Sequence, residues 1–135
     1  MEPRIQYTRS RDGIKIAYWT LGQGGTPLLM TSPLAFSNIS LEWRIPGLRA
    51  WYESLSQRRQ LVRYDHRGSG MSQRGIEDYA FEKSVGDLEA VADLIQSPFD
   101  VFGFGGSGMW AIALCSRHPE LVRRLVLWSV PVDGF

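Results

Sequence analysis

FDVFGFGGSGMWAIALCSRHPE, residues 99–120, is the stretch that decides the fold. It opens with the apolar run Phe99–Phe102, which is typical of a buried strand. Five of the six residues 103–108 are glycine or serine, and the apolar, helix-forming run Met109–Cys115 follows them. Pro119 predicts that this helix ends just before it, because the residue preceding a proline is disfavoured in the helical conformation. We therefore expect a strand, a glycine-rich turn and a buried helix.

Three kinds of segment use such a turn. In a nucleophile elbow, G-x-S-x-G, a serine stands on the sharp turn. In a dinucleotide fingerprint, G-x-G-x-x-G, the pattern that Gly103, Gly105 and Gly108 satisfy, the glycines approach a pyrophosphate. That fingerprint also needs an acidic residue at the end of the next strand, whereas Asp133 lies beyond it. The third interpretation is a tight turn without chemistry. A P-loop is excluded, because no Lys-Ser or Lys-Thr follows the glycines.

Length and composition restrict the class of protein. A chain of 135 residues predicts one domain, residues 1–135, with a sizeable core. The net charge of +1, with both signs mixed along the chain, gives no reason to expect nucleic acid or acidic membranes as partners. The single cysteine, Cys115, excludes an intrachain disulfide and a cysteine metal cluster, and we expect a buried, inert thiol and no cofactor. The N-terminus lacks a signal-peptide core, and no run reaches the roughly 20 apolar residues of a membrane span, so we expect a cytoplasmic protein.

The rest of the chain alternates strands and helices. Asp12-Gly13 is a hairpin turn signal between the alternating segments Ile5–Arg9 and Ile14–Thr20, and Leu28–Met30 is typical of a central strand. Residues 32–45 are irregular but partly apolar, as in loops that pack over a site.

Further helices and strands are predicted between residues 46 and 95 and after the glycine-rich turn. They are a helix from Pro46 with a stripe at Leu48, Trp51, Tyr52 and Leu55, a strand at Gln60–Tyr64, a helix at Ser84–Ile95 opened by a capping box at Ser84–Asp87, and a strand at Arg123–Val130. This order predicts an α/β fold of about six strands, mostly parallel, with helices on both faces.

Two segments carry a resemblance to a known family. Asp65–Ser72 reads D-x-R-G-x-G-x-S, and Arg117–Leu127 reads R-H-P-E-x-V-x-x-L-V-L. With the Asp12-Gly13 hairpin and the glycine turn, they stand in the order and spacing of the N-terminal half of an α/β-hydrolase. Nearly the whole chain resembles this family, and it is most similar to hydrolase domains fused to bacterial regulators or adenylate cyclases. The resemblance implies a truncated α/β-hydrolase fold.

The sequence departs from the family at the elbow. Counted back from His118, the family's G-x-S-x-G falls on residues 103–107, which read Gly-Phe-Gly-Gly-Ser. Gly105 therefore stands where the resemblance places the nucleophile, and Ser107 stands at the last elbow glycine. A displaced nucleophile at Ser107 stays open, but a serine at a helix start is more often a cap or a packing residue.

The given sequence also contains no segment that matches the family's other catalytic residues. In the family, the lid, the acidic triad member and the catalytic histidine all lie beyond residue 135. His66 and His118 match no catalytic position, and a serine without a base is a weak nucleophile. Ser32-Pro33 stands where many relatives carry His-Gly, and a proline offers no N–H to an oxyanion.

These departures favour a catalytically inactive binding or assembly module with a hydrolase fold. The alternative is a serine hydrolase or esterase for small esters, completed by a second chain or using Ser107. Any surviving pocket should lie at the carboxyl ends of the parallel strands and could take a small-molecule ligand. Its expected lining is Ser32, Pro33, Phe104, Gly105, Gly106 and residues of the loop at 34–43.

A truncated sheet has a further consequence at Leu125–Trp128. This apolar strand would be interior in a complete family sheet but becomes an edge, and exposed apolar edges pair with other chains. We expect a homodimer joined near this strand or the neighbouring helix, since two-fold symmetry is the commonest closure. A partner chain that carries the missing half is the alternative.

Overall fold

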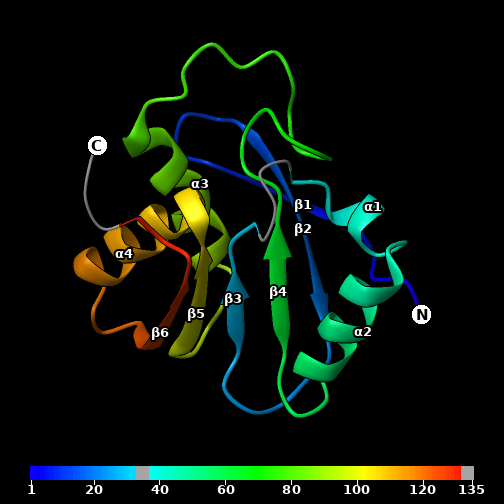
Figure 1. The fold of residues 1–135 in the computed structure, drawn as a ribbon. Coiled ribbons are helices and arrows are strands. Elements are labelled where there is room, and N and C mark those ends of the chain that lie inside the picture. Colours follow the sequence, from blue (N-terminus) through cyan, green and yellow to red (C-terminus); the bar gives the residue numbers. More distant parts are fainter. Residues whose placement is uncertain (33–36, 132–135) are drawn as a thin grey trace.

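The computed structural model describes residues 1–32 and 37–131, and Figure 1 shows a central sheet flanked by helices. The strands are β1 (Gln6–Arg9), β2 (Lys15–Leu21), β3 (Leu28–Met30), β4 (Leu61–Tyr64), β5 (Phe99–Phe104) and β6 (Val122–Trp128). The helices are α1 (Ile39–Glu42), α2 (Pro46–Leu55), α3 (Phe81–Ala92) and α4 (Gly108–Arg117), with a 3-10 turn η1 (Gly105–Ser107) before α4. Several residues used in the sequence argument lie outside the described residues: Pro33, residues 34–36 of the loop at 34–43, and Asp133.

The strands form one sheet in the order β1-β2-β4-β3-β5-β6. β1 and β2 are antiparallel to their neighbours, whereas β4, β3, β5 and β6 run parallel to one another. Gly13 closes the predicted hairpin with a φ of 84°, a conformation that glycine adopts without strain. The predicted mostly parallel α/β sheet is therefore confirmed.

Helices cover both faces of the sheet, as expected (Figure 1). On one face, α3 and α4 pack against the strands through Leu88, Val91, Ala111 and Leu114. On the other face, α1 and α2 enclose an aromatic core in which the Trp19 ring meets the rings of Trp43 and Tyr52 edge-on. The predicted end of α4 just before Pro119 is also confirmed, since Arg117 is its last residue.

Two helix starts differ from the sequence prediction. The expected irregular segment 32–45 contains α1, which begins because the Asn38 side chain accepts hydrogen bonds from the N–H groups of Ser40 and Leu41 at 3.2 and 3.0 Å. The predicted capping box at Ser84–Asp87 is wrong, because α3 begins three residues earlier at Phe81 and both side chains are buried inside it. Asp87 binds an arginine from another segment instead.

β6 is the last strand of the sheet, and its outer edge pairs with no other strand in the described part of the chain. Its apolar side chains are well exposed, with Val126 at 49%, Leu127 at 40% and Trp128 at 61%. The strand is shorter than predicted at its end, because Ser129 takes a φ of 54° and leaves the extended conformation. Val130 then packs against Gly108 at the start of α4.

Candidate functional site

The turn between β5 and α4 is an elbow whose apex is Gly105. Gly105 has a φ of 46°, in the left-handed region that side chains rarely adopt. A Cβ added at Gly103 would lie only 3.0 Å from the Cα of Gly108 and 3.1 Å from the Cβ of Ala111. Glycines therefore let α4 pack directly on β5, and this close approach fixes the direction in which the apex points.

The apex itself is open. Apart from Gly105 itself and its two chain neighbours, none of the described residues has an atom within 4 Å of the position that a Cβ at Gly105 would occupy. Glycine brings no nucleophile, acid or base, so the chemistry of the apex is limited to backbone groups. The first N–H groups of a helix have no partner within the helix, and they favour a carbonyl oxygen or an anion nearby.

Ser107 lies in the described turn next to the ends of β3 and β5. Its Oγ is 2.7 Å from the carbonyl oxygen of Phe104, 2.9 Å from the Oγ1 of Thr31 and 3.2 Å from the carbonyl oxygen of Ser32. A hydroxyl has one proton to donate, so at most one of the two carbonyls receives it at a time. Ser107 stands at the N-cap position of α4, but its side chain makes no capping bond there, so of the two expected roles, cap or packing residue, the contacts fit the packing residue. The Ser107 side chain connects the elbow to the residues that follow β3 through these hydrogen bonds.

Neither histidine contacts Ser107. His66 packs edge-on against the ring of Trp110 at 5.2 Å, and its buried Nδ1 has no hydrogen-bond partner among the described residues. Burial, and then the charge of Arg63, lower the pKa of His66. His118 lies at the far end of α4, where its Nε2 is 2.8 Å from Glu89. The described residues thus give Ser107 no base.

A cavity of about 640 Å³ lies beside the apex, and we call it the elbow cavity. It is lined by Gly47, Trp51, Phe104, Gly105, Trp128 and Ser129. The Phe104 ring meets Trp51 edge-on at 5.6 Å and stacks on Trp128 at 6.2 Å. The described lining residues carry no charged side chain, so this surface suits a small apolar or aromatic molecule.

The residues expected to line a pocket lie in different places. Phe104 and Gly105 line the elbow cavity, while Gly106 lines a separate hollow of about 380 Å³ with Phe81, Met109 and Trp110. Ser32 is 5% exposed and belongs to a buried hydrogen-bond network. Pro33 lies outside the described residues.

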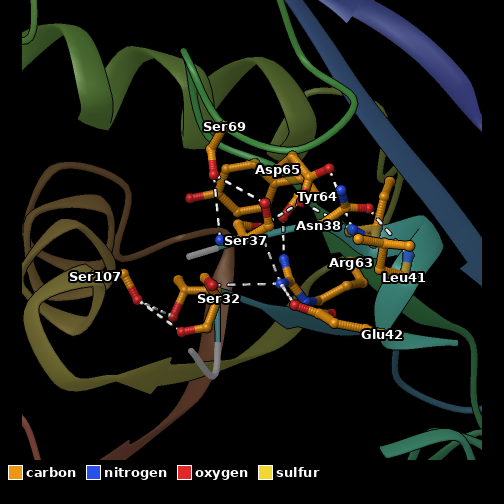
Figure 2. Close-up of polar contacts among 12 residues, drawn as sticks. Ser32, Ser37, Asn38, Leu41, Glu42, Arg63, Tyr64, Asp65, Ser69 and Ser107 are labelled. Carbon is orange, nitrogen blue, oxygen red and sulfur yellow. Dashed lines mark hydrogen bonds and ion pairs between the residues drawn. The ribbon is translucent and has the colours of Figure 1, made fainter. Parts of the chain in front are cut away.

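A buried polar network lies beside the elbow, and Figure 2 shows Ser32 between Ser107 and Arg63. Arg63 Nη2 forms an ion pair of 2.7 Å with Glu42 and donates to Ser37 Oγ at 3.0 Å. Burial, the largest single influence, would lower the pKa of Arg63, but Glu42 together with Tyr52 and Asp65 raises it overall. Arg63 is fully buried and Glu42 is 2% exposed, so each charge depends on the other.

The Arg67 of the D-x-R-G-x-G-x-S motif joins three segments of the chain. Its guanidinium donates to Asp87 on α3 at 2.8 Å and to Asp12 in the first hairpin at 2.9 Å. These hydrogen bonds from Arg67 hold the pKa of Asp12 well below its usual value. Arg67 therefore has a structural function.

The Asp65 of the same motif shapes the loop above the sheet. Its carboxylate accepts from the N–H groups of Ile39 at 3.0 Å and Met71 at 2.8 Å. Gly70 has a φ of 51°, and a Cβ there would collide with Asp65. Ser72 Oγ accepts from the Ala17 N–H at 2.8 Å and links the loop to β2. The motif that carries the family resemblance is thus used here to hold the fold together.

The sequence argument did not assign Trp51, Trp128, Arg63 or Glu42 to the site. The sequence places Trp51 only in the apolar stripe of a helix, and Trp128 only in an edge strand. The sequence did contain one indication of a buried ion pair near the site: Arg63 is a charged residue within the otherwise apolar run Leu61–Tyr64.

Metal chemistry finds no support in the described ranges 1–32 and 37–131, which hold no group of three or more His, Cys, Asp or Glu placed to bind an ion. Cys115 is half-buried rather than fully buried, and burial raises the pKa of its thiol. Among the described residues, no helix is long and apolar enough to cross a membrane.

Comparison with known proteins gives relatives in both sequence and structure. No family model matches the chain. It is 36% identical over 97 residues to the 2-hydroxymuconate semialdehyde hydrolase of Pseudomonas sp. (strain CF600), a match that covers 61% of this chain and 32% of that protein. It is 27% identical over 130 residues to the cis-3-alkyl-4-alkyloxetan-2-one decarboxylase of Shewanella oneidensis, covering 93% of this chain and 38% of that protein.

Solved structures match over nearly the whole chain. A deformylase from Pseudomonas putida S16 superposes with a TM-score of 0.79 at 27% identity, covering 97% of this chain and 48% of that one. A hydrolase from Pseudomonas aeruginosa PA01 superposes with a TM-score of 0.81 at 22% identity, covering 98% of this chain and 48% of that one. The chain thus spans less than half the length of each of these relatives.

Proposed function

This chain belongs to the α/β-hydrolase fold family, and we propose that it uses the family's elbow to bind a small apolar ligand rather than to hydrolyse one. Gly105 at the apex is the observation that carries the proposal. Acyl transfer in this family needs a nucleophilic side chain at the turn. Gly105 keeps the positive φ of the apex and leaves the space of a side chain empty.

The surroundings of Ser107 support the same proposal. Its hydroxyl is within hydrogen-bond distance of the carbonyls of Phe104 and Ser32 and of the Thr31 hydroxyl. A serine attacks a carbonyl only when a base removes its proton. Because its hydroxyl is held in this way and no histidine contacts it among the described residues, Ser107 fits a structural role better than that of a nucleophile.

The elbow cavity supplies the binding surface. Its volume of about 640 Å³ lies within the range of about 300–1,000 Å³ that is usual for small-molecule pockets. The rings of Trp51, Phe104 and Trp128 provide apolar contact, and the start of α4 provides backbone N–H groups for one polar atom of the ligand. The ligand class is therefore a small, mainly apolar or aromatic molecule with a carbonyl, hydroxyl or similar group at one end.

A serine hydrolase is the second candidate, and two observations favour it. The relatives named above include a semialdehyde hydrolase and a deformylase. Ser107 is also close to the apex and partly exposed, with its Oγ 2.9 Å from the Oγ1 of Thr31. In this alternative a second chain or a further segment would supply the histidine and the acid.

Hydrolysis of short-chain aryl esters tests the two candidates directly. The purified chain, Ser107→Ala and the control Ser97→Ala, which changes an exposed serine away from the elbow, are compared under identical conditions. We expect no turnover above the uncatalysed rate from any of the three folded proteins. Turnover that disappears only in Ser107→Ala would overturn the proposal in favour of the hydrolase.

Ligand binding is tested with 2-naphthol, followed by the quenching of tryptophan fluorescence. Gly47→Leu adds a side chain to a helical glycine that lines the elbow cavity and has free space around it. Gly86→Leu is the matched control, because Gly86 is also a helical glycine with free space but lies away from the cavity. We expect at least ten-fold weaker binding to Gly47→Leu and unchanged binding to Gly86→Leu. Equal affinity for both variants, or no saturable binding to the parent protein, would contradict the assignment of this cavity.

A further inference from the structure

We propose that Tyr52 is a redox-active tyrosine, which loses one electron through Trp51 while its phenolic proton passes to Glu42. The proposal concerns the aromatic core behind the elbow cavity and does not depend on whether that cavity binds a ligand. It rests on the contact between the two rings, on the carboxylate that accepts the phenol's hydrogen bond, and on the weaker acceptor that faces the neighbouring indole of Trp19.

The rings of Trp51, Tyr52 and Trp19 form a continuous series of contacts from the elbow cavity into the core. Trp51 lines the cavity and is half-buried, whereas Tyr52 and Trp19 are fully buried. The centroids of Trp51 and Tyr52 are 5.8 Å apart with nearly parallel planes, and those of Tyr52 and Trp19 are 5.2 Å apart. Indole and phenol lose an electron more easily than the rings of Phe102 and Phe104, which also contact Trp51. An oxidant at Trp51 can therefore withdraw an electron from Tyr52 without touching it.

The phenol of Tyr52 has a proton acceptor in place. Its hydroxyl donates to Oε2 of Glu42 at 2.8 Å, while Oε1 of the same carboxylate is paired with Arg63 at 2.7 Å. An ionised carboxylate only accepts hydrogen bonds, so the phenol is the donor. Burial raises the pKa of Tyr52, and the phenol keeps its proton until the ring is oxidised. An oxidised phenol is a very strong acid, and the carboxylate then takes the proton.

The oxidation is balanced by a one-electron oxidant such as a photoexcited flavin. One electron leaves the ring of Tyr52 and reaches the flavin through Trp51. The phenolic O–H bond breaks and the proton binds to Glu42, which leaves a neutral phenoxyl radical beside a neutral carboxylic acid. Arg63 keeps its charge, and a buried guanidinium favours an ionised partner. The proton therefore returns to Tyr52 when the reduced flavin gives the electron back.

The hydrogen bond of Trp19 explains why the oxidation ends at Tyr52. Trp19 Nε1 donates to the carbonyl oxygen of Ile39 at 3.2 Å. A carbonyl oxygen is a much weaker base than a carboxylate, so an oxidised Trp19 keeps its proton and recovers an electron from Tyr52. The Trp43 ring, 6.3 Å from that of Trp19, is connected to Tyr52 by the same series of contacts. Of these rings, Tyr52 is the one whose proton has a carboxylate acceptor.

Flash photolysis with riboflavin tests the final site of oxidation. Transient absorption distinguishes phenoxyl from indolyl radicals, and ascorbate reduces radicals on exposed side chains first. We expect the 135-residue chain to form a phenoxyl radical that ascorbate reduces slowly, because Tyr52 is buried. Tyr52→Phe keeps the ring and should lose this radical. Tyr64→Phe is the matched control and should retain it, since Tyr64 is equally buried but its hydroxyl has no hydrogen-bond partner among the described residues.

Two further variants test the path of the electron and of the proton. Trp51→Phe should lose most of the slowly reduced radical, whereas Trp110→Phe should retain it, because the half-buried Trp110 contacts His66 and lies outside the series. Folded Glu42→Gln should also lose it, since an amide does not take the proton.

A slowly reduced phenoxyl radical that persists in Tyr52→Phe, or that is missing from the folded parent chain, would overturn the proposal. Equal yields from the variants Trp51→Phe and Trp110→Phe would overturn the path through Trp51.

Discussion

Replacing Glu42 with glutamine should destabilise the protein by about 3 kcal/mol, because it leaves the charge of Arg63 buried without its ion-pair partner. The pair is 2.7 Å long, with side chains that are 2% and 0% exposed. Glutamine keeps the shape of the side chain and can still accept from Tyr52, whose hydroxyl donates to Glu42 at 2.8 Å. The amide then turns its NH2 group toward Arg63, so the expected loss arises from the missing charge and hydrogen bond to Arg63 rather than from packing.

Urea unfolding followed by tryptophan fluorescence measures this loss, because Trp19 and Trp43 lie in the core beside the network. The midpoint should fall with an unchanged slope, as for a variant that alters stability and not the area exposed. Glu53→Gln is the control. It removes the same charge from a pair with Arg49 of 3.0 Å that is about half exposed, and such pairs contribute at most about 1 kcal/mol.

A loss below about 1 kcal/mol for Glu42→Gln, equal to that of the control, would refute the reasoning. It would mean that other groups, above all Asp65, neutralise Arg63 without Glu42. The double variant Arg63→Met with Glu42→Leu distinguishes the two cases. Replacing both partners with apolar residues removes the unpaired charge and should cost less than Glu42→Gln alone.

Three further predictions concern stability. Hydrogen bonds from Arg67 lower the pKa of Asp12, so the parent protein should lose stability as the pH falls below about 4, and urea midpoints of Asp12→Asn should fall less over this range. Burial lowers the pKa of His66, so stability should also decline as the pH falls below about 6.5, and His66→Gln should lack that decline in the same assay. Gly105→Ala should cost about 1 kcal/mol through its positive φ, whereas Gly106→Ala, with equal space and no positive φ, should show no comparable loss in thermal melting. Parallel pH profiles, or equal losses for the two glycine variants, would contradict these assignments.

Elements with a strong local signal could be predicted from the sequence. The Asp12-Gly13 turn gave the hairpin, and the glycines from Gly103 onward gave the turn between β5 and α4. Pro119 marked the end of α4. Each signal acts through the backbone of a few adjacent residues, so no tertiary information was needed.

Features that depend on tertiary contacts could not be predicted in the same way. Glu42 and Arg63 are 21 residues apart, and their pairing follows from the position of α1 over β4. The start of α3 was also missed, because Ala80 precedes it and offers no side-chain cap. The elbow cavity unites Trp51 on α2 with Trp128 on β6, two residues that no local pattern connects.

The Arg67 contacts have a consequence for the kinetics of folding. Arg67 bonds to Asp12 across 55 residues and to Asp87 across 20, so these bonds form only when the hairpin, the loop after β4 and α3 have come together. Contacts that form after the transition state affect the unfolding rate more than the folding rate. We infer that the Arg67 contacts form late in folding. The unfolding rate should therefore depend on Arg67 more strongly than the folding rate does.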